Sequence, residues 1–369
     1  MLHRSDWRWH PADREPIPVH GPPHRSNPAR GALRVCSWNI QFAAGHDQLF
    51  FYDGGTAVSV PRPVVLRTLE GILADLQRID ADVLLLQEVD RGSRRTHFID
   101  QHAWLAARLD HPYHASTPYH RVHFVPAPAH EMLGRVNMHL SIFSRHPLLP
   151  GTRVQLPLLR EPWYRRHFNL RRALMEVPLV HEVGPAWLFH THLSAFSRGD
   201  GTVPRQLARV AAELAAADQR GEPWLLAGDF NALPPGDDPA RLGADASMYG
   251  APSPLAPLYG RARCAVSARA HLDEPRRWRT WVPFRASAPQ RALDHLFGSA
   301  GSTFSDVAVD RRAMGRSDHL PLVCTWDPSG AEAPTADPAG GSSRASNVSR
   351  PGSVHEGRRG SPHGAGSDE

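Results

Sequence analysis

Short apolar runs, each bounded by turn residues, recur through the middle of the chain and limit it to a sheet-based fold. Runs of about four to eight residues with few polar breaks are typical of strands that are buried on both faces. We therefore predict eight strands, at residues 33–39, 81–88, 139–144, 173–180, 186–193, 224–229, 293–297 and 320–326.

Two segments have helical periodicity instead. Apolar residues recur at intervals of three and four between Val65 and Leu76, and again between Leu207 and Leu214. The second segment follows Thr202 and a proline two residues later, which is a common helix start. Buried strands covered by a few helices predict one layered α/β domain.

Composition changes at both ends of this region. Residues 1–31 are rich in Pro, His and Arg without hydrophobic periodicity, and residues 328–369 are rich in Gly, Ser, Pro and Ala. Such segments bury too little apolar surface to offset the entropy of ordering. We predict that both are disordered and that the folded domain covers residues 32–327.

The composition excludes several classes of protein. The three cysteines have no paired spacing, so no disulfide framework is expected. The sequence has neither an 18-residue apolar run nor an apolar leader, so we expect a cytoplasmic protein without a membrane anchor. A formal net charge of +5 is mild and would suit an anionic partner.

Polar side chains stand at or beside six of the apolar runs. Loops just outside strand ends are where ligands usually bind, because the sheet holds those side chains rigidly beside an open crevice. Each residue alone could be a turn residue or a buried core residue. The set consists of Asn39, Glu88, His192, Asp229, Asn231, Asp294, Asp318 and His319.

Taken together, these residue types indicate a particular chemistry. Carboxylate and amide oxygens suit Mg²⁺ or Mn²⁺, and a histidine held by an aspartate can take a proton from water. Amides and neutral imidazoles can donate hydrogen bonds to phosphoryl oxygens. We find no nucleophilic cysteine or serine elbow. The set therefore predicts metal-assisted hydrolysis of a phosphoester.

The motifs around these residues resemble the series of the endonuclease/exonuclease/phosphatase superfamily, in the same order and over about residues 33–327. The resemblance implies a four-layer α/β sandwich, with two central mixed β-sheets flanked by helices, and a catalytic domain at 32–327. The motifs are WNIQF at Asn39, LLLQEVD at Glu88, THLSAFS at His192, GDFNALP at Asp229 and Asn231, ALDHLF at Asp294 and SDHLPL at His319.

The same resemblance implies a metal site. Glu88 would be the principal ligand of Mg²⁺ or Mn²⁺, with Asn39 beside it. Asp318 would bind the metal directly or through water. A second metal would change this assignment.

It also implies catalytic roles. His319 would be the general base toward water, oriented by Asp294, and Asp229 would position that water or help to deprotonate it. Which of Asp229 and His319 takes the proton stays open. Asn231 and His192 would donate hydrogen bonds to the phosphoryl oxygens as negative charge builds.

The substrate is less constrained. Arg171 or Arg172, in a stretch rich in arginine and aromatic residues, would contact an anionic substrate or belong to a solvated loop. We expect a monomeric phosphodiesterase acting on nucleic acid or a similar phosphodiester. The alternatives are a lipid or small-molecule phosphodiesterase, a phosphatase, and a binding or scaffold protein that has kept the fold without catalysis.

Overall fold

Two seven-stranded β-sheets form the centre of the fold in a computed structural model that describes residues 9–23, 28–166, 168–195 and 200–329. The first sheet has the order β1 (Arg14–Ile17), β7 (Gly151–Gln155), β8 (Ala173–His181), β9 (Gly184–His192), β10 (Trp224–Asp229), β12 (Asp294–Gly298) and β11 (Arg263–Cys264). The second has the order β13 (Thr303–Val309), β14 (Leu322–Asp327), β3 (Leu33–Asn39), β4 (Val83–Asp90), β6 (Gly134–Ser144), β5 (Tyr113–Val125) and β2 (Val19–His20).

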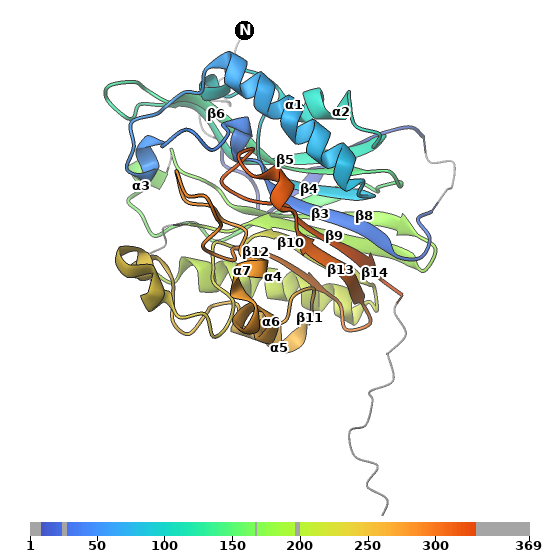
Figure 1. Cartoon of the computed structure of the whole chain (residues 1–369). Helices are drawn as coiled ribbons and strands as arrows, with labels where there is room; N and C mark the ends of the chain where they lie inside the picture. The colour runs from blue at the N-terminus through green and yellow to red at the C-terminus, as the bar shows by residue number, and fades with distance from the viewer. Residues whose placement is uncertain (1–8, 24–27, 167, 196–199, 330–369) are drawn as a thin grey trace, which may run out of the picture. The chain divides into compact units, whose positions relative to one another are not determined.

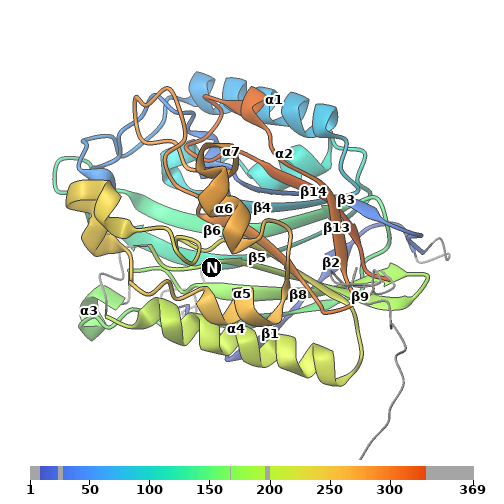
Figure 2. The same cartoon turned by 60° about the horizontal axis from the view of Figure 1, so that its bottom comes forward.

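Helices cover the outer face of each sheet. Figure 1 shows α1 (Arg62–Ile79) and α2 (Gln101–Ala106) above the second sheet, and α4 (Thr202–Gln219) and α5 (Ala256–Arg261) below the first. Figure 2 shows the same layers from a second direction. The predicted four-layer sandwich is therefore confirmed. The shorter helices are α3 (Trp163–Arg166), α6 (Ala268–Asp273), α7 (Pro275–Trp278), η2 (Gln41–Ala43), η3 (Phe51–Asp53), η4 (Arg94–Thr96), η5 (Pro239–Met248) and η6 (Arg311–Ala313).

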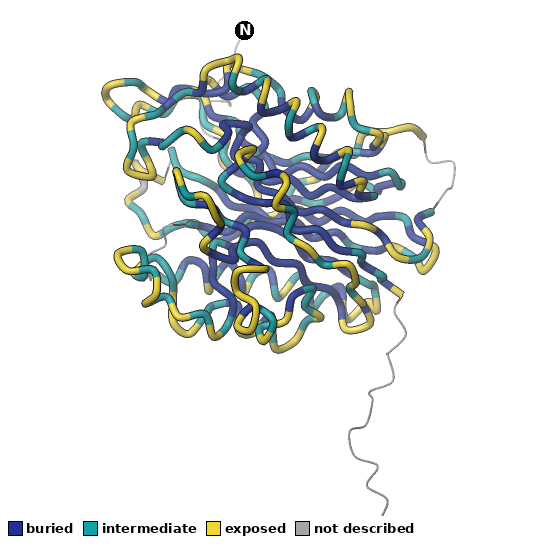
Figure 3. Tube along the Cα trace, in the orientation of Figure 1, coloured by how far each residue is buried: buried dark blue, intermediate teal, exposed yellow. Residues whose placement is uncertain are grey.

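The core lies between the two sheets and between each sheet and its helices, and the central strands are mostly dark blue, that is buried, in Figure 3. Helix α1 buries Val65, Leu69, Ile72 and Leu76, which are the apolar positions that its periodicity singles out. Helix α4 does the same with its own stripe, which packs on the first sheet. All eight predicted apolar runs form strands, namely β3, β4, β6, β8, β9, β10, β12 and β14.

Each sheet is mixed, and each contains one parallel strand pair that places polar side chains at its carboxyl end. β3 runs parallel to β4 in one sheet, and β9 runs parallel to β10 in the other. The carboxyl ends of parallel neighbours lie at the same edge. Asn39 therefore pairs with Gln87 in the second sheet, and Asp229 pairs with His192 in the first.

The predicted amino-terminal boundary at residue 32 is wrong. β1 pairs with β7 and β2 pairs with β5, so strands already occur within residues 14–20. Ile17 is 1% exposed, and Arg14 forms ion pairs with Glu176 and Glu213. These strands escape detection because they are short edge strands with little apolar content. At the other end, β14 stops at Asp327. The predicted disorder of the tail falls on residues that, from 330 onward, lie outside the described part.

Candidate active site

The two sheets meet at a cluster of polar side chains that follow the strand ends. The side-chain amide of Asn39, at the end of β3, donates to Glu88 Oε1 on β4 at 3.2 Å. The same nitrogen donates to Asp229 Oδ2 on β10 at 3.1 Å. Asn39 thus joins a carboxylate of its own sheet to a carboxylate of the opposite sheet.

Glu88 occupies a break in the strand ladder. The register between β4 and β6 shifts between Leu86 and Val89, and Glu88 itself has a φ of 56°. A non-glycine residue in this left-handed region is strained by about 1–3 kcal/mol. Bulges of this kind re-aim a side chain at the edge of a sheet. The strained backbone therefore directs the Glu88 carboxylate toward Asn39.

The GDFN motif is built around a close approach of two strands. A Cβ on Gly228 would lie 1.9 Å from the carbonyl oxygen of Thr191, so only glycine fits there. The next residue, Asp229, is 1% exposed and accepts the backbone N–H of Asn231 at 2.9 Å. Asn231 has a φ of 48°, which asparagine tolerates better than most residues. This tight turn fixes the positions of the Asp229 and Asn231 side chains.

His319 and Asp294 form a buried pair beside Asp229. His319 Nδ1 lies 2.7 Å from Asp294 Oδ2, and His319 Nε2 lies 3.5 Å from Asp229 Oδ2. Burial opposes a charge on the imidazole, but the carboxylates of Asp294 and Asp229 raise the pKa of His319 well above its ordinary value. Burial raises the pKa of Asp229 to about 6. The neighbouring carboxylates therefore favour the charged imidazole of His319.

His192 is neutral and held from two sides. Burial, with help from the nearby charge of Arg172, lowers its pKa well below the ordinary value. Its Nδ1 lies 3.2 Å from the hydroxyl of Tyr119, and its Nε2 lies 3.1 Å from Asn231 Nδ2. The Nε2 atom is also 3.3 Å from Asp229 Oδ2. The imidazole therefore faces the same carboxylate as His319.

The carboxylates crowd one another. Burial raises the pKa of Asp318 to about 7, and the charges of Glu88, Asp53 and Asp229 add to that rise. Asp294 Oδ1 is buried without a hydrogen-bond partner among the described residues. Ligand atoms of Asp229, Asp294 and His319 also lie within 4.8 Å of one another, close enough to share one ion. Crowded and partly buried negative charge at these carboxylates, Glu88 and Asp318 among them, favours a divalent counter-ion.

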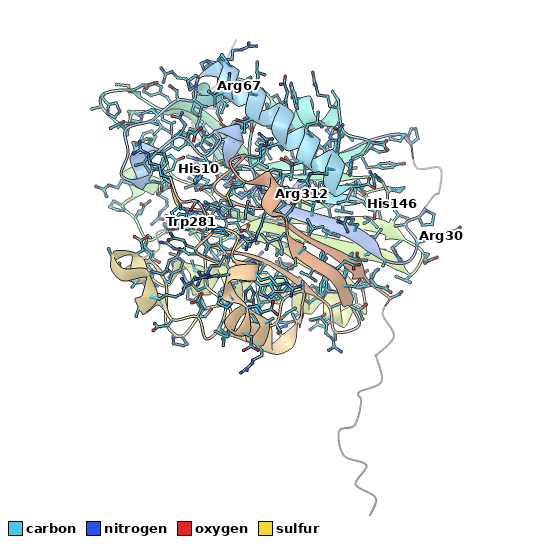
Figure 4. The ribbon with its side chains drawn as sticks, viewed as in Figure 1. His10, Arg30, Arg67, His146, Trp281 and Arg312 are labelled. Atoms are coloured by element: carbon cyan, nitrogen blue, oxygen red, sulfur yellow. The ribbon has the colours of Figure 1, made fainter. Side chains whose placement is uncertain are left out.

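The two arginines differ, as consecutive residues of an extended segment usually do. Arg172 lies with its guanidinium carbon 5.2 Å from the Tyr119 ring, and its Nε and Nη1 atoms are buried without hydrogen-bond partners in the described part of the chain. Arg171 instead directs Nη2 to His10 Nδ1 at 3.1 Å. His10 is labelled in Figure 4. Arg172 therefore lies beside Tyr119 with unpartnered N–H groups in the described part of the chain, whereas Arg171 contacts His10.

Sequence reasoning missed residues that border the site. Tyr119 lies on β5, which was not predicted because polar residues and Pro118 interrupt its apolar alternation. Asp53 lies on η3, where burial raises its pKa to about 6 and the charge of Glu88 contributes. Trp281, labelled in Figure 4, forms backbone bridges with Arg291 and His319. A strand assignment at 113–125 would have pointed to Tyr119, but no local pattern marks the other two.

A comparison with protein-family profiles identifies the family of the chain. The profile of the Endonuclease/Exonuclease/phosphatase family matches residues 36–319, a span that begins before Asn39 and ends on His319. The chain belongs to this family. No curated protein sequence shows significant similarity to it. No helix of the described residues is long and apolar enough to cross a membrane.

Several solved structures share the fold. An endonuclease/exonuclease/phosphatase from Beutenbergia cavernae is 26% identical with a TM-score of 0.56, covering 82% of this chain and 73% of its own. The human nocturnin catalytic domain with bound sulfate is 17% identical with a TM-score of 0.52, covering 84% and 96%. ANGEL2, a 2′,3′-cyclic phosphatase, is 19% identical with a TM-score of 0.53, covering 81% and 96%. At 17% and 19% identity, the last two show the fold alone.

Proposed function

We propose that the chain is a divalent-metal-dependent phosphodiesterase that activates water with a buried Asp/His group. The observation that carries the proposal is the convergence of Glu88 and Asn39 from one sheet with Asp229, paired to His319, from the other. Family members typically hydrolyse phosphoesters. A catalytically silent scaffold has no need for buried carboxylates that repel one another, so that alternative is disfavoured.

The donor set fits Mg²⁺ or Mn²⁺. Glu88 and Asp318 would hold the ion through carboxylate oxygens, and the crowding of negative charge around Asp318 supports this. Asn39 Oδ1 accepts the backbone N–H of Gln41 at 3.0 Å, so Asn39 would help chiefly by orienting Glu88. The bound ion would polarise a phosphoryl oxygen and offset its charge.

Two groups compete to accept the proton of the attacking water. His319 can accept it only as a neutral imidazole, and the neighbouring carboxylates favour its charged form. Asp229 lies between His319 and His192, with Oδ2 at 3.5 and 3.3 Å from their Nε2 atoms, and its carboxylate can accept a proton when ionised. We therefore assign the base role to Asp229 acting with His319, which Asp294 orients.

Donors to the phosphoryl oxygens surround the same carboxylate. Asn231 and His192 would donate as negative charge builds, and Arg172 would add a cation whose Nε and Nη1 have no other partner in the described structure. Tyr119 stabilises this side of the site through its contact with His192 Nδ1. Arg172 is thus the proposed substrate-binding arginine. Action as a monomer in the cytoplasm remains part of the proposal.

A substrate panel tests the proposal. The full chain is assayed with Mg²⁺, Mn²⁺ or EDTA on plasmid DNA, single-stranded DNA, RNA, sphingomyelin and bis-p-nitrophenyl phosphate, with Asp229→Asn as the inactive control. We expect metal-dependent cleavage of a phosphodiester that EDTA and Asp229→Asn both abolish. Cleavage of sphingomyelin alone would favour the lipid alternative, and no turnover of any substrate would contradict the assignment.

A further inference from the structure

An aromatic ladder runs from strand β4, close to Glu88 in the sequence, to the surface. It begins at Asp90, two residues after Glu88 on β4, which binds Arg95 through two hydrogen bonds of 2.9 Å. The Arg95 guanidinium lies 3.5 Å from the centre of the Phe42 ring. Phe42 meets the ring of Phe50 edge-on, with centroids 5.1 Å apart. All of these side chains are buried, so the base of the ladder is rigid.

The ladder ends on an exposed ring. Tyr52 stacks on Phe50 with centroids 5.4 Å apart and ring planes only 3° from parallel. Phe51 contacts Tyr52 edge-on at 5.2 Å, which further restrains the ring. Tyr52 is nevertheless 41% exposed. A tyrosine that is supported from behind yet open in front presents a flat, preformed aromatic surface.

This surface borders the candidate site. Burial raises the pKa of the Tyr52 hydroxyl well above its ordinary value, and the charges of Glu88 and Asp318 contribute to the rise, although part of the residue is exposed. The neighbouring Asp53 feels the charge of Glu88 as well. The geometric link is the ladder itself, because Asp90 lies two residues after Glu88 and Phe42 lies three residues after Asn39.

We propose that Tyr52 is a stacking platform for a planar ring of the substrate, and that the substrate class is a nucleotide phosphodiester whose base lies on this platform. The inference rests on the proposed function and makes it more specific. A flat face with a polar hydroxyl edge suits a nucleobase, which has a π-face and a polar rim. An acyl chain gains more from an apolar groove than from one flat ring.

Equilibrium dialysis in Mg²⁺ tests the platform without requiring turnover. The probes are thymidine 5′-monophosphate and ribose 5-phosphate, which carry the same kind of phosphate with and without a base. Tyr52→Leu keeps an apolar side chain but removes the ring, Tyr52→Phe keeps the ring, and Phe98→Leu is the control at a residue that is 60% exposed and outside the ladder. Because Tyr52 is at the surface, none of these changes should prevent folding.

We expect Tyr52→Leu to weaken binding of thymidine monophosphate about 5- to 150-fold, the range for one base stacked on an aromatic ring. Ribose phosphate binding should not change, and Tyr52→Phe and Phe98→Leu should behave as wild type. Equal binding of the nucleotide by wild type and Tyr52→Leu would overturn the platform. So would the absence of nucleotide binding by wild type, or an equal loss for ribose phosphate, which would indicate contact with the sugar.

A second assay separates this inference from the proposed function. Thymidine 5′-p-nitrophenyl phosphate and methyl p-nitrophenyl phosphate share a leaving group, and only the first carries a base. We expect Tyr52→Leu to raise KM for the thymidine ester with little change in kcat, and to leave the methyl ester unaffected. If no variant hydrolyses either ester, the proposed function fails, while dialysis still decides the platform.

Discussion

His319 and Asp294 are joined by a 2.7 Å contact in which both side chains are almost completely buried. They come from segments that the sequence separates by 25 residues, and the contact forms only because β12 presents Asp294 toward the loop before β14. A carboxylate that holds one imidazole nitrogen fixes the direction in which the other nitrogen points. Here that direction is toward Asp229.

Removal of this pair should reveal that it acts as a unit. We expect His319→Ala and Asp294→Ala each to lower kcat by about 10²–10⁴-fold, and the double variant to be little worse than His319→Ala. The check is a double-mutant cycle on a p-nitrophenyl phosphodiester. The exposed Asp273→Ala serves as control, and losses that multiply in the double variant would show that the two residues act independently.

The Glu88 carboxylate should be needed for metal binding and not for folding. We expect Glu88→Gln to weaken Mn²⁺ binding at least tenfold and to abolish metal-dependent turnover, because an amide cannot supply the charge that a divalent ion requires. Calorimetric titration with Mn²⁺ and thermal unfolding measure the two properties. Glu70→Gln, on the exposed face of α1, is the matched control. Full activity of Glu88→Gln at saturating Mg²⁺ would show that Glu88 is not a required metal ligand.

The amino-terminal strand should contribute to stability. Ile17 on β1 is 1% exposed, so Ile17→Ala should lower the free energy of unfolding by about 2–5 kcal/mol. Val183→Ala removes an apolar group from a side chain that is 46% exposed and should cost far less. Urea unfolding of both variants provides the comparison. If both substitutions lower the free energy of unfolding by the same small amount, β1 does not contribute to stability.

Buried histidines should make the protein acid-sensitive. Burial lowers the pKa of His295 to about 3, and its Nε2 faces the carbonyl oxygen of Ala232 at 3.1 Å. Between the unfolded pKa of about 6.5 and this folded value, only the unfolded chain takes up the proton, so stability falls as pH falls. One such group contributes up to about 1.4 kcal/mol per pH unit.

His295→Gln should therefore reduce the slope of unfolding free energy against pH by about that amount between pH 4.5 and 5.5. Phe297→Leu, which disturbs the ring packed beside His295, should lower stability by a similar amount at every pH. Urea titrations across this range separate the two effects. An unchanged slope in His295→Gln would show that other groups carry the acid sensitivity.

The central strands could be predicted from the sequence because they are buried on both faces. Each run then remains apolar throughout, as in β10, where every residue is buried. The edges could not be predicted in the same way. β13 contains only exposed and half-buried residues, and β5 carries three polar or histidine positions before Pro118 and its register shift. Such strands are specified by their neighbours and not by their own composition.

Some residues of the candidate site could be predicted from the sequence, and others could not. Motif residues such as Asp229 and His319 stand directly beside apolar runs, and this position makes them visible in the sequence. The difference between Arg171 and Arg172 is invisible there, because it depends on which way each side chain turns. Tyr52 and Tyr119 become relevant only once distant segments are packed together.

The span from Asn39 to His319 has a consequence for biosynthesis. The first residue of the cluster emerges early from a ribosome, while the last emerges only when nearly all of the folded region has been made. The hydrogen bond between Asn39 and Asp229 also requires both sheets to have docked. Under the proposed function, a nascent or partly folded chain lacks the assembled site, so turnover would report complete folding of the domain.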